Sequence, residues 1–430
     1  MFTGNAKIGH TLNPNPTSVR GFLGHQIGWQ HFLKVRKGRV TRRGLQISAK
    51  WWQGKLKGMN IPWNTCGSDF GTTPWRSGAN QDWSTAVSNG MTGKDAYANA
   101  LAQIREAVDA VDPQDTAVAR FWVFGDGRAG PTFNLLQGYD SVSGIETKFL
   151  DDFVELCSIA RAKNVKLLPV LWDFHALEKA VMPGDPSYNQ STPSMKGHVG
   201  LFTVKACVND YVNNALSKLL QRVKDEGYSD VILAWDIFNE PEQIMAGNLY
   251  PYRERQVDMV PVAAMQYFVA QCSVAIHALG FKATLGSADL RYCWENQSAG
   301  NFPRSGWQPI FPGEQGACHL WSDAALQKAA NDDPSGALDL YQVHYYQSSY
   351  VLFDPARNPV SQYVSSGKPI LVGEIGAIES PYDAGKNIIN NGFDGYLFWP
   401  FYPDGTGGPS YTGEWSNVYD PSSQRNKFSK

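Results

Sequence analysis

Two glutamates in this chain each follow an apolar run of the kind that forms a buried strand. Residues 231–237 are mostly apolar and β-favouring, and the sequence Asn-Glu-Pro, with Glu240 at its centre, comes shortly after them. A second apolar run, residues 369–373, is followed directly by Glu374. The proline after Glu240 ends the strand and favours an extended backbone at that glutamate. The pattern predicts two carboxyl groups at the ends of two core strands.

Two carboxyl groups are the minimum apparatus for hydrolysing a glycosidic bond. One attacks the sugar or activates water, and the other protonates the leaving oxygen. The Asn-Glu-Pro motif alone is a weak signal, because motifs this short recur by chance. The second glutamate at a strand end strengthens the hypothesis, since parallel α/β barrels keep their chemistry at the C-terminal ends of their strands.

The elements that must position these glutamates alternate along the chain between apolar strand-like runs and amphipathic helical patterns. The expected strands cover residues 55–63, 117–123, 165–172, 231–237, 282–287, 338–344, 368–374 and 393–399. The expected helices cover residues 94–111, 146–163, 202–226, 254–279, 322–331 and 382–391. Eight strands alternating with helices, without an evident linker, predict a single α/β domain folded as a (β/α)8 TIM barrel.

The two ends of the chain depart from the regular alternation. Residues 1–31 are predicted to be an irregular basic leader, and the catalytic domain is expected to cover residues 32–430. Residues 32–41 alternate around a Lys-Gly turn and predict an N-terminal β-hairpin. The last thirty residues are rich in Gly, Pro and Ser, so the eighth helix is expected to be weak or missing.

Other polar and aromatic residues recur at the same ends of the predicted strands. They are Arg120, His175, Asn239, His344, Tyr346 and Trp399. Each one alone has a structural explanation, such as a buried ion pair, a hydrogen-bonded core histidine or packing of an indole. Their joint placement at the ends of successive strands is hard to assign to packing, and it predicts one substrate-binding site.

As a set, these residues resemble the signature of glycoside hydrolase family 5, a family of retaining β-glycosidases on (β/α)8 barrels. The matching residues, in order and spacing, are Arg120, His175, Asn239, Glu240, His344, Tyr346, Glu374 and Trp399. The resemblance covers residues 32–402, and the opening hairpin followed by Gly-Met-Asn-Ile-Pro-Trp63 is similar to that of the family's mannanases. It implies that Glu240 is the acid/base and Glu374 the nucleophile. The His-x-Tyr pattern selects Tyr346 over its neighbour.

Physical chemistry assigns matching roles to the supporting residues. Glu374 needs a cation and a hydroxyl donor to stay ionised, and Arg120 and Tyr346 are the candidates. Glu240 is expected to stay protonated because of the negative charge nearby. Asn239 is expected to bind the sugar 2-hydroxyl.

The remaining candidates are expected to hold the reacting sugar. His175 and His344 would supply further polar contacts around it. Trp399 offers an apolar face for stacking, and a cis bond to Pro400 would turn the indole inward.

The charge distribution is uneven although the net charge is only −2. Residues 1–68 hold 11 Lys and Arg and no acidic residue, whereas the remainder holds 27 basic and 40 acidic residues. We expect the basic segment to lie against the acidic body rather than to bind nucleic acid, because it lacks interleaved aromatics. No apolar run is long enough for a transmembrane helix, and no membrane contact is expected. The first thirty residues lack a signal-peptide pattern, so localisation stays open between a cytoplasmic protein and one whose signal has been removed.

The cysteines and histidines give no metal-binding pattern, so neither a metal nor another cofactor is predicted. Cys157 and Cys272 fall in helical patterns and are expected to be packed thiols. Cys293 and Cys318 flank a long loop and could pair in an oxidising compartment.

The favoured function is therefore a retaining β-glycoside hydrolase that acts on β-linked carbohydrate, with β-1,4-mannan ahead of β-1,4-glucan. Two alternatives stay open, namely an exo-acting β-glycosidase of the same family and a catalytically silent carbohydrate-binding barrel. The sequence leaves the oligomeric state undetermined.

Overall fold

The structure is a computed structural model, and it describes twelve stretches of the chain. They are residues 50–62, 69–71, 83, 92–125, 127, 129–134, 141–177, 198–245, 260–295, 319–346, 354–376 and 381–399. The predicted leader at 1–31, the hairpin at 32–41 and the expected weak eighth helix after residue 399 lie outside the described residues. The domain boundary between residues 31 and 32 therefore stays a prediction.

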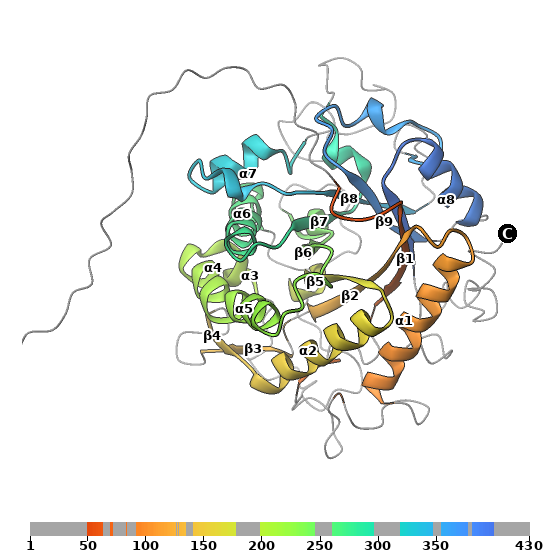
Figure 1. Cartoon of the computed structure of the whole chain (residues 1–430). Helices are drawn as coiled ribbons and strands as arrows, with labels where there is room; N and C mark the ends of the chain where they lie inside the picture. The colour runs from red at the N-terminus through yellow and green to blue at the C-terminus, as the bar shows by residue number, and fades with distance from the viewer. Residues whose placement is uncertain are drawn as a thin grey trace, which may run out of the picture. The chain divides into compact units, whose positions relative to one another are not determined.

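Eight parallel strands close into a barrel, as predicted (Figure 1). Around the barrel the order is β1, β10, β9, β8, β7, β6, β5 and β2. Their bounds are β1 (Leu56–Ile61), β2 (Thr116–Gly125), β5 (Lys166–Asp173), β6 (Trp235–Asn239), β7 (Ala283–Ser287), β8 (Tyr341–Tyr346), β9 (Ile370–Gly376) and β10 (Gly395–Phe398). Each of the eight predicted strands corresponds to one strand of this barrel.

Helices surround the strands on the outside of the barrel (Figure 1). Their bounds are α1 (Gly93–Asp109), α2 (Thr147–Ala162), α3 (Val199–Thr203), α4 (Lys205–Tyr211), α5 (Ser217–Asp225), α6 (Val262–Ala278), α7 (Asp323–Ala329) and α8 (Pro381–Asn390). The start of α1 shows how the sequence sets a boundary, because the Thr92 side chain accepts a hydrogen bond from the Asp95 N–H. Such a cap satisfies one of the free donors of the first turn.

Three elements differ from the prediction. The single helix expected at 202–226 is divided into α3, α4, a π-helical turn at Val212–Leu216 and α5. A short antiparallel pair, β3 (Pro131–Phe133) and β4 (Val142–Ile145), was not predicted, because each strand is too short to show a period. Strand β6 begins four residues later than expected, since the start of the apolar run joins β5 only through an isolated bridge at Ile232.

The barrel interior changes from apolar to polar along the strands. Successive inward positions in β1 are Leu56, Gly58 and Asn60, because alternate residues of a strand face the same side. The lower interior is an apolar cluster of Trp52, Leu56, Val118, Leu168, Leu233, Ala234, Leu340, Leu371 and Leu397. Three strands then place polar residues two or four positions further along, namely Arg120 in β2, Asp236 in β6, and Gln342 and His344 in β8. The barrel interior is therefore apolar at the N-terminal ends of the strands and polar, although buried, towards their C-terminal ends.

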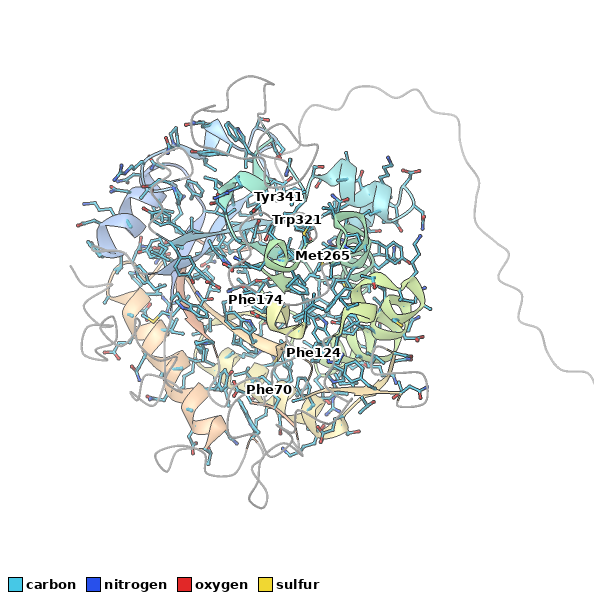
Figure 2. All side chains as sticks on the ribbon, turned by 180° about the vertical axis from the view of Figure 1, so that it is seen from behind. Phe70, Phe124, Phe174, Met265, Trp321 and Tyr341 are labelled. Atoms are coloured by element: carbon cyan, nitrogen blue, oxygen red, sulfur yellow. The ribbon has the colours of Figure 1, made fainter. Side chains whose placement is uncertain are left out.

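A second and larger apolar core fills the space between strands and helices. Phe70, Phe124, Met265, Trp321 and Tyr341 belong to it (Figure 2). Burial of this apolar area is the main favourable contribution to folding. Cys157 in α2 and Cys272 in α6 are also buried in this layer, and both are free thiols, as predicted.

Charge pairs tie the described part of the basic segment to the acidic body. Lys50 contacts Asp394 and Lys57 contacts Asp115, each at 2.5 Å. Residues 1–49, which hold most of the basic residues of this segment, lie outside the described residues, so the placement of the segment stays a prediction. Among the described residues, no helix has the length and apolar character needed to cross a membrane.

The closest backbone approach at the barrel wall generates a stability prediction. A Cβ at Gly58 would lie 1.7 Å from the Val118 carbonyl oxygen, a backbone atom that cannot move away alone. We expect Gly58→Ala to lower the free energy of unfolding by about 3 kcal/mol or more. Gly367→Ala is the control, because its Cβ meets open space and only its left-handed backbone (φ +75°) opposes the change. That control should lose only about 1–2 kcal/mol in urea unfolding, and equal losses would contradict the steric explanation.

Candidate active site

The first glutamate stands where β6 turns into a short 3-10 helix, Pro241–Ile244. Its backbone is left-handed, with φ 49° and ψ 56°, so the extended conformation expected before Pro241 was wrong. Two backbone hydrogen bonds explain the difference. The Glu240 N–H donates to the Gly286 carbonyl at 2.6 Å, and the Glu240 carbonyl accepts from the Gln243 N–H at 3.0 Å. A non-glycine residue in this region is strained and persists only where its surroundings hold it.

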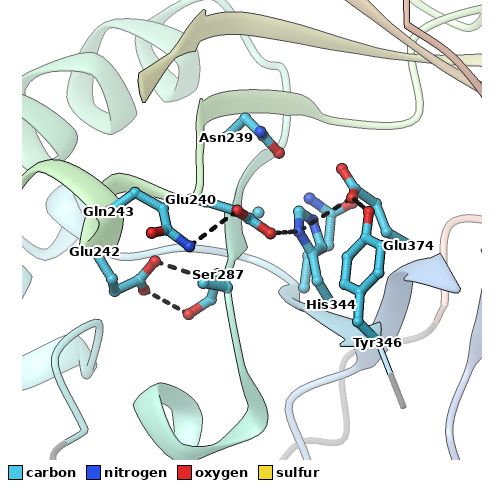
Figure 3. Close-up of polar contacts among 12 residues, drawn as sticks. Asn239, Glu240, Glu242, Gln243, Ser287, His344, Tyr346 and Glu374 are labelled. Atoms are coloured by element: carbon cyan, nitrogen blue, oxygen red, sulfur yellow. Dashed lines mark hydrogen bonds and ion pairs between the residues drawn. The ribbon is translucent and has the colours of Figure 1, made fainter. Parts of the chain in front are cut away.

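The second glutamate faces the first across a histidine (Figure 3). Glu374 lies on β9 and is paired in register with His344 on β8. His344 Nδ1 is 2.6 Å from Glu240 Oε1 and 3.5 Å from Glu374 Oε2. One carboxylate oxygen of each glutamate and this nitrogen lie within 4.8 Å of one another. The two carboxyl groups that are 134 positions apart in the chain therefore meet in space.

Arg120 connects the strands beneath this pair. Its side chain is fully buried, and its Nη1 donates to Glu374 Oε1 at 2.6 Å. The same guanidinium donates to Asp236 at 2.9 Å, to Asn60 at 2.9 Å and to Asn239 at 2.8 Å. One residue of β2 thus contacts side chains from β1, β6 and β9, which fixes their relative positions at the upper end of the barrel.

The environment of Glu374 contains opposing influences on its ionisation. Burial and the nearby carboxyl group of Glu240 raise the pKa of the Glu374 carboxyl group above its usual value, although His344, Arg120 and the hydroxyl of Tyr346 oppose the shift. Tyr346 donates its O–H to Glu374 Oε2. Burial, together with the negative charges of Glu374 and Glu240, raises the pKa of this phenol well above its usual value, so it keeps its proton. Both oxygens of Glu374 therefore accept a hydrogen bond, an arrangement that favours the carboxylate form.

An aromatic wall adjoins the carboxyl pair. Asn239 Nδ2 and Trp122 Nε1 both donate to Asp173 Oδ2, at 2.8 Å and 2.7 Å. The Trp122 ring lies 4.8 Å from the Arg120 guanidinium carbon. It meets the Trp399 ring edge-on with centroids 5.3 Å apart. Trp399 is thus held beside the site through Trp122.

Six of the eight predicted site residues are joined directly by hydrogen bonds or ion pairs. They are Arg120, Asn239, Glu240, His344, Tyr346 and Glu374. Trp399 joins the site through its ring contact with Trp122. His175 lies in the 3-10 turn Phe174–Leu177 that follows β5, and its side chain is outside the described part. The Trp399–Pro400 bond is also outside, so the proposed cis isomer stays a prediction. Cys293 is a free, buried thiol, and Cys318 lies outside the described residues.

The sequence interpretation did not single out several residues that complete the site. They are Asn60, Asp173, Asp236, Glu242, Gln243 and Gln342. A signal existed for two of them, because Asp236 and Gln342 interrupt otherwise apolar strands at inward-facing positions. A charged or amide side chain at such a position needs a buried partner.

The pair of glutamates and His344 are also of the types that ligate metal ions. The Arg120 guanidinium, 2.6 Å from Glu374, disfavours a cation at this point because like charges repel. The arrangement fits two carboxyl groups that act on an uncharged substrate better than it fits a metal centre.

Comparison with known proteins agrees with this geometry. The chain is 23% identical over 384 residues to a mannan endo-1,4-beta-mannosidase of Cryptopygus antarcticus, covering 84% of this chain and 83% of that protein. Its fold is similar to the endo-1,4-beta-mannanase of Eisenia fetida, with TM-score 0.61, 22% identity and coverage of 87% and 90% of the two chains. It is also similar to the beta-mannanase of Mytilus edulis, with TM-score 0.58, 20% identity and coverage of 81% and 87%. No family model matches the chain.

The barrel and its opposed glutamates define an enzyme of the glycoside hydrolase class. Within that class, the predicted resemblance to glycoside hydrolase family 5 agrees with the similarity to a mannan endo-1,4-beta-mannosidase in sequence and to mannanases in fold.

The buried imidazole of the site generates a pH prediction. Burial lowers the pKa of His344 from 6.5 to about 4. Between these two values the unfolded chain binds a proton at this residue and the folded protein does not, so stability falls as the pH falls. The contribution amounts to about 3 kcal/mol over the window. We expect His344→Asn to remove it, which urea unfolding at pH 7.5, 6, 5 and 4 would measure. Parallel curves for the variant and the unmodified protein would contradict the assignment.

Proposed function

We propose that this protein hydrolyses β-1,4-linked mannan by a double displacement that retains the configuration at the anomeric carbon. The observation that carries the proposal is the approach of the two carboxyl groups, with oxygens of Glu240 and Glu374 within 4.8 Å. Retaining enzymes need their carboxyl groups about 5–5.5 Å apart, whereas inverting enzymes leave about 6.5–9.5 Å for a water molecule. The distance supports direct attack by one carboxylate.

Glu374 is the nucleophile in this proposal. Arg120 and Tyr346 each donate to one of its oxygens, which orients the carboxylate and favours its charged form. In the first step an oxygen of Glu374 bonds to the anomeric carbon while the bond to the leaving sugar breaks. The product is a covalent glycosyl ester on Glu374.

Glu240 is the acid/base. It gives a proton to the leaving oxygen in the first step and takes one from water in the second, when that water displaces the ester. His344 and Gln243 contact its two oxygens, at 2.6 Å and 3.3 Å, and hold it towards the reacting bond. Asn239, fixed between Arg120 and Asp173, is placed to bind the sugar 2-hydroxyl.

The similarity to mannanases favours mannan over glucan as the substrate, and it favours cleavage within the polymer over removal of terminal sugars. Trp399 supplies an aromatic face beside the carboxyl pair on which a pyranose ring can stack. His175 follows β5 near Asp173 and is assigned to the same sugar site by its position in the chain.

The nucleophile assignment makes a direct prediction. We expect Glu374→Gln to lower kcat on β-mannan by on the order of 10⁴-fold, because no covalent ester can form. Binding of mannohexaose, measured by calorimetry, should persist. A carbohydrate-binding barrel without activity is excluded if the unmodified protein releases reducing ends. Unchanged turnover in the variant would remove Glu374 from the mechanism.

The acid/base assignment is tested with substrates that differ in leaving group. Glu240→Ala should lower kcat/KM about 10²–10⁴-fold for phenyl β-mannobioside, which needs a proton on its leaving oxygen. The loss should be small for the 2,4-dinitrophenyl analogue, whose leaving group departs without one. Azide should restore kcat for the dinitrophenyl substrate by replacing water in the second step, with a β-mannobiosyl azide product.

Product length decides the mode of cleavage. We expect ivory-nut mannan to yield a mixture of short oligosaccharides at the earliest times, with a rapid fall in polymer length. Mannose as the sole early product would instead support exo-acting cleavage. Carboxymethyl cellulose is the matched test for β-1,4-glucan, and a higher kcat/KM on it would overturn the substrate assignment.

A further inference from the structure

We propose that Glu242, which lies two residues after the acid/base, is a positioning residue that holds Glu240 in its proton-donating orientation. The inference rests on the proposed function of Glu240. It assigns a role in the reaction to a third carboxyl group, whose described hydrogen bonds come from Ser287, Ala288 and Trp321.

Glu242 is enclosed by donors from two distant parts of the chain. Its side chain is 1% exposed. Ser287 Oγ donates to Oε1 at 2.6 Å and the Ala288 N–H donates to Oε2 at 3.1 Å, both at the end of β7 (Figure 3). Trp321 Nε1, from the segment that leads into α7, donates to Oε1 at 2.7 Å. The carboxyl group therefore ties the turn after β6 to two neighbouring segments.

Burying a carboxyl group costs free energy, which argues against a purely structural role for Glu242. Removing a charged group from water costs several kcal/mol unless partners compensate for it. Burial accordingly raises the pKa of Glu242 to about 7, although the hydrogen bonds that the carboxyl group accepts oppose the shift. An apolar side chain of similar volume could fill the same space at a lower cost. Strongly shifted carboxyl groups beside a site of chemistry are candidates for a functional role.

The turn that Glu242 fastens is the one that carries the strain. Glu240 has a left-handed backbone, and Glu242 lies one residue beyond Pro241 in the 3-10 turn that follows. On the other side of the strained residue, the Glu240 N–H is held by the Gly286 carbonyl. The strained conformation of Glu240 is therefore held by contacts before and after it in the chain. Both sets of contacts involve residues at the end of β7. Surroundings that over-determine a strained residue are what allow it to persist.

The same turn also supplies a contact to the reactive side chain. Gln243, the residue after Glu242, donates from its Nε2 to Glu240 Oε2 at 3.3 Å. Figure 3 shows the Glu240 carboxyl group pointing towards His344 and that of Glu242 pointing towards Ser287. A shift of the turn would move Glu240 and its Gln243 contact together, and small displacements of a catalytic group can lower rates strongly.

The test compares substrates with two different leaving groups in three variants that weaken the hydrogen bonds of Glu242. Glu242→Gln replaces the carboxyl group with an amide, Ser287→Ala removes one donor, and Trp321→Phe removes another. We expect kcat/KM for phenyl β-mannobioside to fall about tenfold more than kcat/KM for the 2,4-dinitrophenyl analogue. Only the phenyl substrate needs a correctly placed proton donor. Ser273→Ala, at a buried hydroxyl of α6, is the packing control and should leave the ratio unchanged.

The outcomes separate the inference from the proposed function. If Glu240→Ala discriminates strongly between the two substrates while the Glu242 and Ser287 variants lower both equally or not at all, the positioning role is wrong. If Glu240→Ala itself fails to discriminate, the acid/base assignment is wrong instead. Should Glu242→Gln fail to fold, as shown by its thermal unfolding, Ser287→Ala and Trp321→Phe decide the question by the same ratio.

Discussion

The active site depends on one buried guanidinium. Arg120 is fully enclosed, yet it neutralises Asp236 and Glu374 and also contacts Asn60 and Asn239. Burial opposes its charge, but the two carboxylates raise its pKa, so the group stays protonated. Removing one partner of such a network leaves an uncompensated charge, at a cost of about 3–5 kcal/mol. The relative positions of the polar side chains inside the barrel therefore depend on the side chain of Arg120.

The two glutamates reach the reacting bond by different structural routes. Glu374 lies within β9, where it pairs with His344 next to a register shift between β8 and β9, and its position follows from the pairing of the barrel strands. Glu240 lies just past a strand end in a strained turn, and its position depends on local contacts with Gly286, Gln243 and the Glu242 fastening. A nucleophile must approach one carbon atom closely, whereas an acid/base serves two steps with opposite proton transfers. The nucleophile is therefore placed by strand pairing, and the acid/base is placed by contacts of a turn.

Most of the barrel was predictable because alternation of apolar and polar residues reports strand and helix directly. The failures have identifiable causes. The left-handed Glu240 was missed because the preference imposed by Pro241 was overcome by the hydrogen bond to the Gly286 carbonyl, a contact between separate strands. The β3–β4 pair was missed because four residues or fewer carry no readable period. Asp236 was missed because its role comes from its ion pair with Arg120, which is 116 positions away in the chain.

The amino-acid sequence by itself determined the fold class, the eight strands and the types of residue at the strand ends. Each of these follows from the local pattern of apolar and polar residues and from the position of a residue at the end of an apolar run. The tertiary structure decided which of those side chains touch. Closure of the barrel brought Glu240, His344 and Glu374 within 4.8 Å, and it placed Glu242 among donors 45 and 79 positions away. Distances of this kind depend on the twist and register of the closed sheet and on the packing above it, which no local stretch of sequence encodes.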